Sequence, residues 1–75
     1  MMLGNIIMER DKELEKDFIR TLATKCRDRD FIISSLTLTY EDEMRKKVIQ
    51  YIHDNPQATV SDIKVKMAYI SVGMQ

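Results

Sequence analysis

The sequence contains few of the residues from which catalytic, metal or cross-linked sites are usually built. Its 75 residues include one cysteine, one histidine, one proline, two glycines and no tryptophan. Cys26 has no partner for an intramolecular disulfide, which favours a reducing compartment. Cys26 and His53 alone are too few for a structural zinc site, and two isolated glycines do not make a phosphate-binding loop. We therefore expect no metal, no cofactor and no enzymatic activity.

An excess of one charge is also missing. The 12 basic and 12 acidic residues give a formal net charge of zero. This balance argues against binding driven by phosphate neutralisation and against attraction to an anionic membrane surface. No apolar run approaches the roughly 20 residues that cross a bilayer, and residues 1–7 lack the length and basic flank of a signal peptide. We therefore expect a cytoplasmic protein that does not bind membranes.

Apolar residues at helical spacing predict an all-α fold. We expect a compact bundle of three to four short helices in a single helical domain over residues 1–75. The helices are predicted at about residues 8–25, 28–35, 40–54 and 59–70. In the first, Leu14, Phe18 and Leu22 form an apolar stripe, and acid-first pairs such as Asp17–Arg20 support the exposed side.

The 40–54 helix has clear start and stop signals. Thr39 is predicted as its N-cap, and Asn55 as a C-cap in the left-handed conformation before Pro56. Val48 and Ile52 belong to its buried stripe. Its surface is predicted to carry three ion pairs at i,i+4 spacing, namely Glu41–Arg45, Asp42–Lys46 and Glu43–Lys47.

The 59–70 helix begins with a capping box. Thr59 is followed three residues later by Asp62, which takes the place of the usual glutamate. Ile63 and Met67 belong to one apolar edge of this helix. Val65 falls outside that edge, so we expect it to be exposed or to contact a partner.

Residues 31–39 allow two interpretations. Asp28 or Asp30 can cap a short helix that ends at Ser35 and is followed by an extended connector. Alternatively, the alternation of leucine and threonine over 36–39 is typical of a strand. No partner strand is evident, and a lone strand leaves its backbone groups unsatisfied. We therefore favour the helix with its connector.

Residues 45–73 resemble the first two helices of winged-helix and related helix-turn-helix regulators. The matching positions are Val48, Ile49, Ile52, Pro56, Ala58, Thr59, Val60 and Ile63. The resemblance implies that "ISVG" at 70–73 enters a recognition helix, with Ser71 as its cap. Under this interpretation Lys64, Lys66 and Ser71 are the expected phosphate contacts.

Two features depart from that pattern. Tyr69 is bulky where the family has a small residue in its tight turn. The sequence ends at Gln75, so we expect no more than four residues of a base-reading helix after Ser71. The simpler interpretation is that residues 55–63 form a capped turn between two packed helices.

The sequence therefore predicts a regulatory or protein-interaction module that binds a macromolecular partner. The alternative is a helix-turn-helix-type DNA-binding regulator that uses the 45–73 corner. A chain this short has a thin core, so we expect it to contact another protein or itself, most simply as a homodimer. The residues predicted at that contact are Phe18, Ile19 and Leu22.

Overall fold

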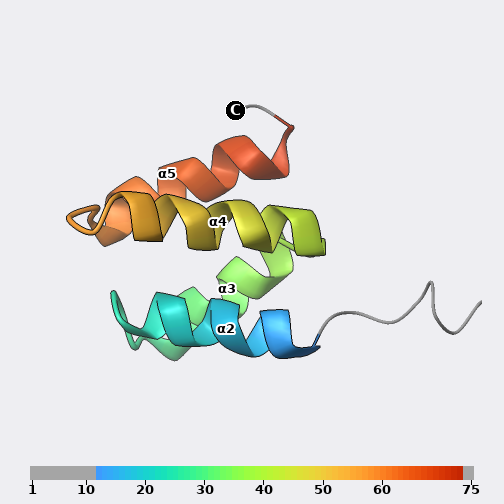
Figure 1. Cartoon of the computed structure of the whole chain (residues 1–75), viewed down its shortest axis with the longest axis horizontal. Coiled ribbons are helices and arrows are strands. Elements are labelled where there is room, and N and C mark those ends of the chain that lie inside the picture. Colours follow the sequence, from blue (N-terminus) through green and yellow to red (C-terminus); the bar gives the residue numbers. More distant parts are fainter. Residues whose placement is uncertain (1–11, 74–75) are drawn as a thin grey trace, which may run out of the picture.

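The computed structural model describes residues 12–73, which form four helices (Figure 1). These are α2 (Lys12–Ala23), α3 (Arg29–Leu38), α4 (Asp42–Asp54) and α5 (Val60–Ser71). Between residues 12 and 73 there is no strand, and the all-α fold predicted from the sequence is confirmed. The predicted start of the first helix at residues 8–11 lies outside the described residues. None of the four helices is long and apolar enough to cross a membrane.

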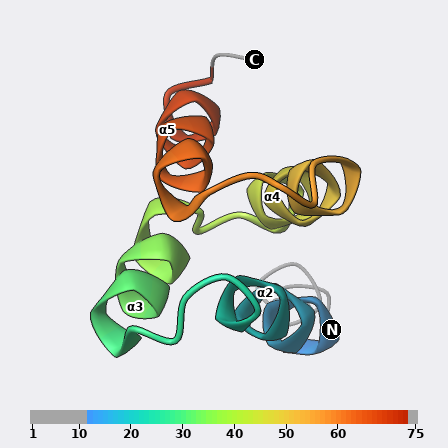
Figure 2. The same cartoon turned by 90° about the vertical axis from the view of Figure 1, so that its left-hand side faces the viewer.

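The helices form a closed ring of neighbours. α2 packs against α4, α4 against α5, α5 against α3 and α3 against α2, as the end-on view in Figure 2 shows. Each helix contributes buried side chains to one shared core because its apolar stripe faces the inside of this ring. The core residues are Phe18, Leu22, Phe31, Val48, Ile52, Ile63, Met67 and Ile70.

α3 continues beyond the end predicted from the sequence. Residues 36–38 are helical, so both the extended connector and the strand were wrong. Three hydroxyl groups donate to carbonyl oxygens four residues earlier: Ser35 to Phe31 at 2.7 Å, Thr37 to Ile33 at 3.1 Å and Thr39 to Ser35 at 2.7 Å. These bonds satisfy polar side chains within the helix, which removes the advantage of an extended backbone.

The start of α4 also differs from the prediction. Glu41 is its N-cap and makes no side-chain capping bond, whereas Thr39 is the C-cap of α3. Asn55 does cap the end of α4, but its φ of −129° is not left-handed. Its side chain instead donates to the Tyr51 carbonyl at 2.9 Å, so the helix terminus is satisfied without a positive φ.

The surface ion pairs were predicted more accurately on α2 than on α4. Asp17–Arg20 on α2 is confirmed at 2.7 Å. On α4, Lys46 pairs with Glu43 at 3.6 Å, three residues before it. The predicted partner of Arg45 was wrong, because Arg45 points inward and not along the helix surface.

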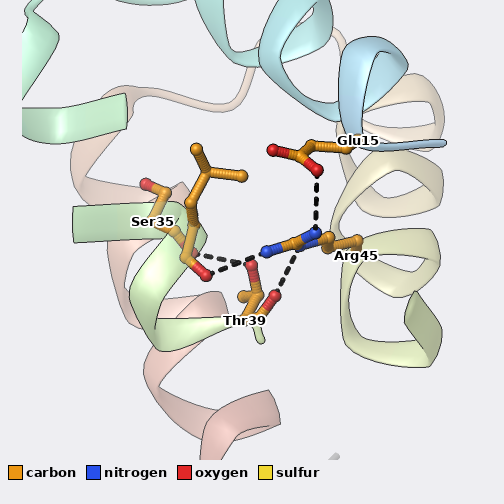
Figure 3. A network of polar contacts seen from close by, with 5 residues as sticks. Glu15, Ser35, Thr39 and Arg45 are labelled. Carbon is orange, nitrogen blue, oxygen red and sulfur yellow. Dashed lines mark hydrogen bonds and ion pairs between the residues drawn. The ribbon is translucent and has the colours of Figure 1, made fainter. Parts of the chain in front are cut away.

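Arg45 links three helices from a buried position (Figure 3). Its side chain donates from Nε to the Thr39 carbonyl at 2.7 Å and from Nη2 to the Leu36 carbonyl at 3.1 Å. Nη1 lies 4.0 Å from a carboxylate oxygen of Glu15 on α2. The guanidinium carbon also lies 5.8 Å from the centre of the Phe18 ring. A cation therefore satisfies the carbonyls at the C-terminus of α3, where the helix dipole favours positive charge.

The corner between α4 and α5 is well capped. The Thr59 hydroxyl accepts from the Asp62 backbone N–H at 3.1 Å, and the Thr59 N–H donates to the Asp62 carboxylate at 3.0 Å. The predicted capping box is thus confirmed. It fixes the first turn of α5 and so the direction in which the side chains of that helix point.

Candidate functional site

α5 is apolar on two opposite sides. Ile63, Met67 and Ile70 face the core and are at most 3% exposed. A second apolar stripe, which we call the outer face, points away from the core. It consists of Val65, Ala68, Tyr69 and Val72.

The spacing of the outer face is that of a single helix surface. Its other members are three, four and seven residues beyond Val65, which places Ala68 and Tyr69 on neighbouring turns on one side of α5 and Val72 at the C-cap of that helix. Val65 is 53% exposed, Tyr69 48% and Val72 67%. Nothing between residues 12 and 73 buries this stripe. An exposed apolar patch that follows a regular element is a common sign of an interaction site.

Two lysines border the outer face, one on each side. The Lys64 ammonium lies 5.7 Å from the centre of the Phe31 ring on α3. The Lys66 ammonium lies 5.5 Å from the centre of the Tyr51 ring on α4. Because α3 and α4 contact α5 from different sides (Figure 2), the two cations lie on the two borders of the apolar stripe. Cation–π contacts at exposed sites are worth about 0.5–1 kcal/mol, which favours these positions for the ammonium groups.

The outer face continues into a groove on the α4 side. This groove has a volume of about 320 Å³ and is lined by Tyr51, Asp62, Val65, Lys66 and Tyr69. The Asp62 carboxylate is already bonded to the Thr59 backbone in the capping box. The exposed stripe thus borders a shallow, open depression on the α4 side.

Two of the three residues predicted at a homodimer contact are not on the surface. Phe18 and Leu22 are completely buried inside the chain, where they pack with core residues of the other helices. They were assigned to a contact because the apolar stripe of α2 is wide, but the ring of helices uses most of its width. Ile19 is half-buried and is the only one of the three that reaches the surface. A homodimer through Ile19 stays a prediction, which sedimentation equilibrium on wild type and Ile19→Glu would test.

The three predicted phosphate contacts do not form a cluster. Lys64 and Lys66 lie against different neighbouring helices. Ser71 is the last residue of α5, and its hydroxyl donates to the Ala68 carbonyl at 2.9 Å. Gly73 follows with a φ of 83°, a conformation that suits glycine and ends the helix. The role of Ser71 as the cap of a following helix was therefore wrong.

A larger groove, of about 570 Å³, lies between α2 and α4. Two of the basic side chains that line it are already bonded to other groups of the chain. His53 lines it together with Arg20 and Lys25. Arg20 is paired with Asp17 at 2.7 Å, and the Lys25 ammonium donates to the Pro56 carbonyl at 2.5 Å. Arg20 lies in the last turn of α2 and Lys25 just beyond its end, where positive charge complements the helix dipole.

Cys26 and His53 do not form a reactive pair. Cys26 is half-buried against the core, whereas His53 is exposed in the last turn of α4. No hydrogen bond joins them in the described part of the chain, and residues 12–73 contain no cluster of three potential metal ligands. His53 lines the groove between α2 and α4, whereas Cys26 does not.

The outer face was only partly visible in the sequence. Val65 was recognised as lying outside the buried stripe, but Tyr69 was considered only as a bulky residue in a turn, and Val72 as part of a helix entry. The missing signal was the spacing of Val65, Tyr69 and Val72 relative to one another.

Family models, curated proteins and solved structures were compared with the chain, and none matches.

Proposed function

We propose that this chain is a small non-enzymatic, cytoplasmic interaction module with a regulatory role. It binds a macromolecular partner, most simply a protein, through the outer face of α5. The observation that carries the proposal is the second apolar stripe on a helix whose inner face already completes the core. Tyr69 is the natural anchor, because exposed tyrosines bury a large apolar area with little loss of side-chain freedom.

The chemistry of the outer face supports a protein partner over DNA. Base edges in the major groove are recognised by hydrogen-bond donors and acceptors, such as arginine and asparagine side chains. Three of the four outer-face residues, Val65, Ala68 and Val72, have no polar side-chain atom. An apolar stripe instead matches the buried centre of protein interfaces, which is enriched in aromatic residues and depleted of charge.

DNA binding through residues 45–73 is the second candidate. The α4–α5 corner has the helix, turn and capped second helix that the resemblance implies. Fluorescence anisotropy with a random-sequence duplex pool at physiological salt tests it. Submicromolar enrichment of one sequence would favour the regulator, and the charge balance of the chain leads us to expect none.

The proposed protein interaction is tested by isolating the chain under native conditions and identifying what remains bound by mass spectrometry. The recovered partner is then purified and titrated with wild type, Tyr69→Ser and the matched exposed variant Lys47→Ser. We expect Tyr69→Ser to weaken binding by about tenfold or more, as for a central aromatic anchor, and Lys47→Ser to have little effect. Equal affinities for all three proteins would overturn the proposal.

A further inference from the structure

We infer that residues 31–40 form an intermolecular β-sheet when α3 detaches from the bundle. The segment covers most of α3 together with its C-cap, and its partner is the same segment of other copies of this chain. The inference is independent of the outer face of α5. It follows from the composition of the segment, from the way in which α3 is held, and from the lack of a strand to pair with among residues 12–73.

The segment has the composition of a strand although it folds as a helix. Residues 31–40, FIISSLTLTY, are the longest stretch of the sequence without a charged side chain, and they include neither proline nor glycine. Six of the ten residues are β-branched or aromatic, the types that favour strands. Segments of about six or seven residues with high β-propensity, low net charge and no proline are typical of cross-β assemblies.

α3 is a weak helix by itself. It has ten residues, whereas isolated helices shorter than about 12–15 residues are marginal in water. The hydroxyl groups of Ser35, Thr37 and Thr39 donate to carbonyl oxygens four residues earlier. Such bonds satisfy the side chains but slightly destabilise the helix. Its last turn contains no basic residue to complement the helix dipole, so α3 needs the rest of the chain to stay helical.

Few buried groups attach α3 to the core. Among the described residues, Phe31 is the one apolar side chain that α3 buries, whereas α2 and α4 each bury two and α5 buries three. Ile32 and Leu36 are partly buried against the core. Ile33 is 48% exposed and Leu38 41%. Because an element with few buried apolar contacts opens at a low cost, α3 is the helix that detaches most easily.

Arg45 holds the C-terminal end of α3 (Figure 3). Its guanidinium donates to the Leu36 carbonyl at 3.1 Å and to the Thr39 carbonyl at 2.7 Å. Both carbonyls belong to residues 31–40. Loss of these bonds leaves two backbone acceptors of the segment without a donor, and a neighbouring strand can supply one.

An extended segment suits stacking on copies of itself. Ile33 and Leu38 would lie on opposite faces of the strand, because successive side chains alternate. Residues 31–40 carry no charge, so identical stacked strands bring no like charges together within the segment. The charged residues Asp30 and Glu41 flank it and limit the strand at both ends. The described chain has no strand of its own, so the backbone partner must come from another copy.

The test uses the full chain and compares wild type with Arg45→Met, which removes both bonds to the end of α3. Loss of bonds to a charged donor should raise the population of chains with a detached α3 by about tenfold or more. Assembly is followed by thioflavin T fluorescence, and fibre diffraction identifies cross-β order by reflections at about 4.7 Å and about 10 Å. We expect Arg45→Met to assemble at least about tenfold faster than wild type, with hydrogen-exchange protection centred on residues 31–40.

Two exposed positions provide a matched pair in the Arg45→Met background. Ile33→Lys places a charge inside the segment, and Val65→Lys places one outside it, on α5. Ile33 is 48% exposed and Val65 53%, so urea denaturation should give similar stabilities for the two double variants. We expect Ile33→Lys to slow assembly by about tenfold or more, and Val65→Lys to leave its rate unchanged.

A second measurement does not depend on Arg45. Wild type held near its thermal midpoint exposes the segment without a substitution, and the same residues should become protected in its assemblies. Aggregates without the cross-β reflections, protection confined to residues outside 31–40, or equal rates for the two lysine variants would overturn the inference. A lack of assembly in both Arg45→Met and heated wild type would do the same, as would association of intact helical bundles that Tyr69→Ser removes.

Discussion

The Thr39 carbonyl, at the C-cap of α3, accepts a 2.7 Å hydrogen bond from Nε of Arg45 on α4. α3 and α4 do not pack side by side in the ring of helices, so this side chain is their direct link. Arg45 is 7% exposed, and its charge is balanced by two carbonyls, the Glu15 carboxylate and the Phe18 ring. Arg45 therefore connects the C-terminal end of α3 to α4, while packing against α2 and α5 holds the rest of α3.

Arg45→Met should destabilise the fold while keeping most of the apolar part of the side chain. The variant leaves the Leu36 and Thr39 carbonyls without their donor, and bonds to charged groups are worth about 1.5–3 kcal/mol. We expect a loss of that size in the free energy of unfolding, measured by urea denaturation. The matched variant Lys46→Met, which removes an exposed ion pair, should change it by less than about 0.5 kcal/mol. Equal effects of the two substitutions would contradict the structural role of Arg45.

A buried valine and an exposed valine should respond differently to the same introduced charge. Val48 is completely buried, and Val65 is 53% exposed. Val48→Asp should prevent cooperative folding, because a domain of this size has a total stability of only about 3–5 kcal/mol and a buried unpaired charge costs a comparable amount. Val65→Asp should give a cooperative thermal transition close to that of wild type. A cooperative melt for Val48→Asp near the wild-type temperature would show that the stripe of α4 is misassigned.

The capping box should stabilise α5 through Thr59. Thr59→Ala removes the acceptor for the Asp62 backbone N–H, and the loss of an N-cap costs about 1 kcal/mol. The neighbouring substitution Ser61→Ala, at an exposed position in the first turn, should have less than half that effect. Both are measured as changes in the free energy of unfolding by urea. If Ser61→Ala is as costly as Thr59→Ala, the first turn is not held by the capping box.

Local signals explain which parts of the fold were predictable from sequence. The capping box at Thr59 and Asp62 is complete within four residues, so its residue types and spacing were sufficient. The buried stripe that contains Val48 and Ile52 was also predictable, because its helical spacing can be recognised within a short segment of the sequence. The extended structure predicted for residues 36–39 was wrong. The threonines of this segment can bond either to water beside an extended backbone or to carbonyls within a helix, so their presence does not favour one state. Only the packing of α3 against α2 and α5 decides between these states.

Contacts between distant residues account for what the sequence did not reveal. Arg45 has acidic residues at helical spacing, which made a surface ion pair the natural prediction. Its actual partners are the C-terminal carbonyls of α3 and a carboxylate on α2. The outer face had a similar ambiguity, because helical spacing shows that Val65 and Tyr69 share a side but not whether the rest of the chain covers it.

The central claim, that the outer face of α5 is the binding surface, is tested most directly by site-specific photo-crosslinking in the cells that make the chain. A photoreactive phenylalanine derivative replaces Tyr69 in one variant and Lys47, on the exposed surface of α4, in another. We expect position 69 to give a discrete crosslinked species that is absent from position 47 and that excess unlabelled wild-type chain suppresses. Equal crosslinking from the two positions, or none from position 69, would contradict the claim.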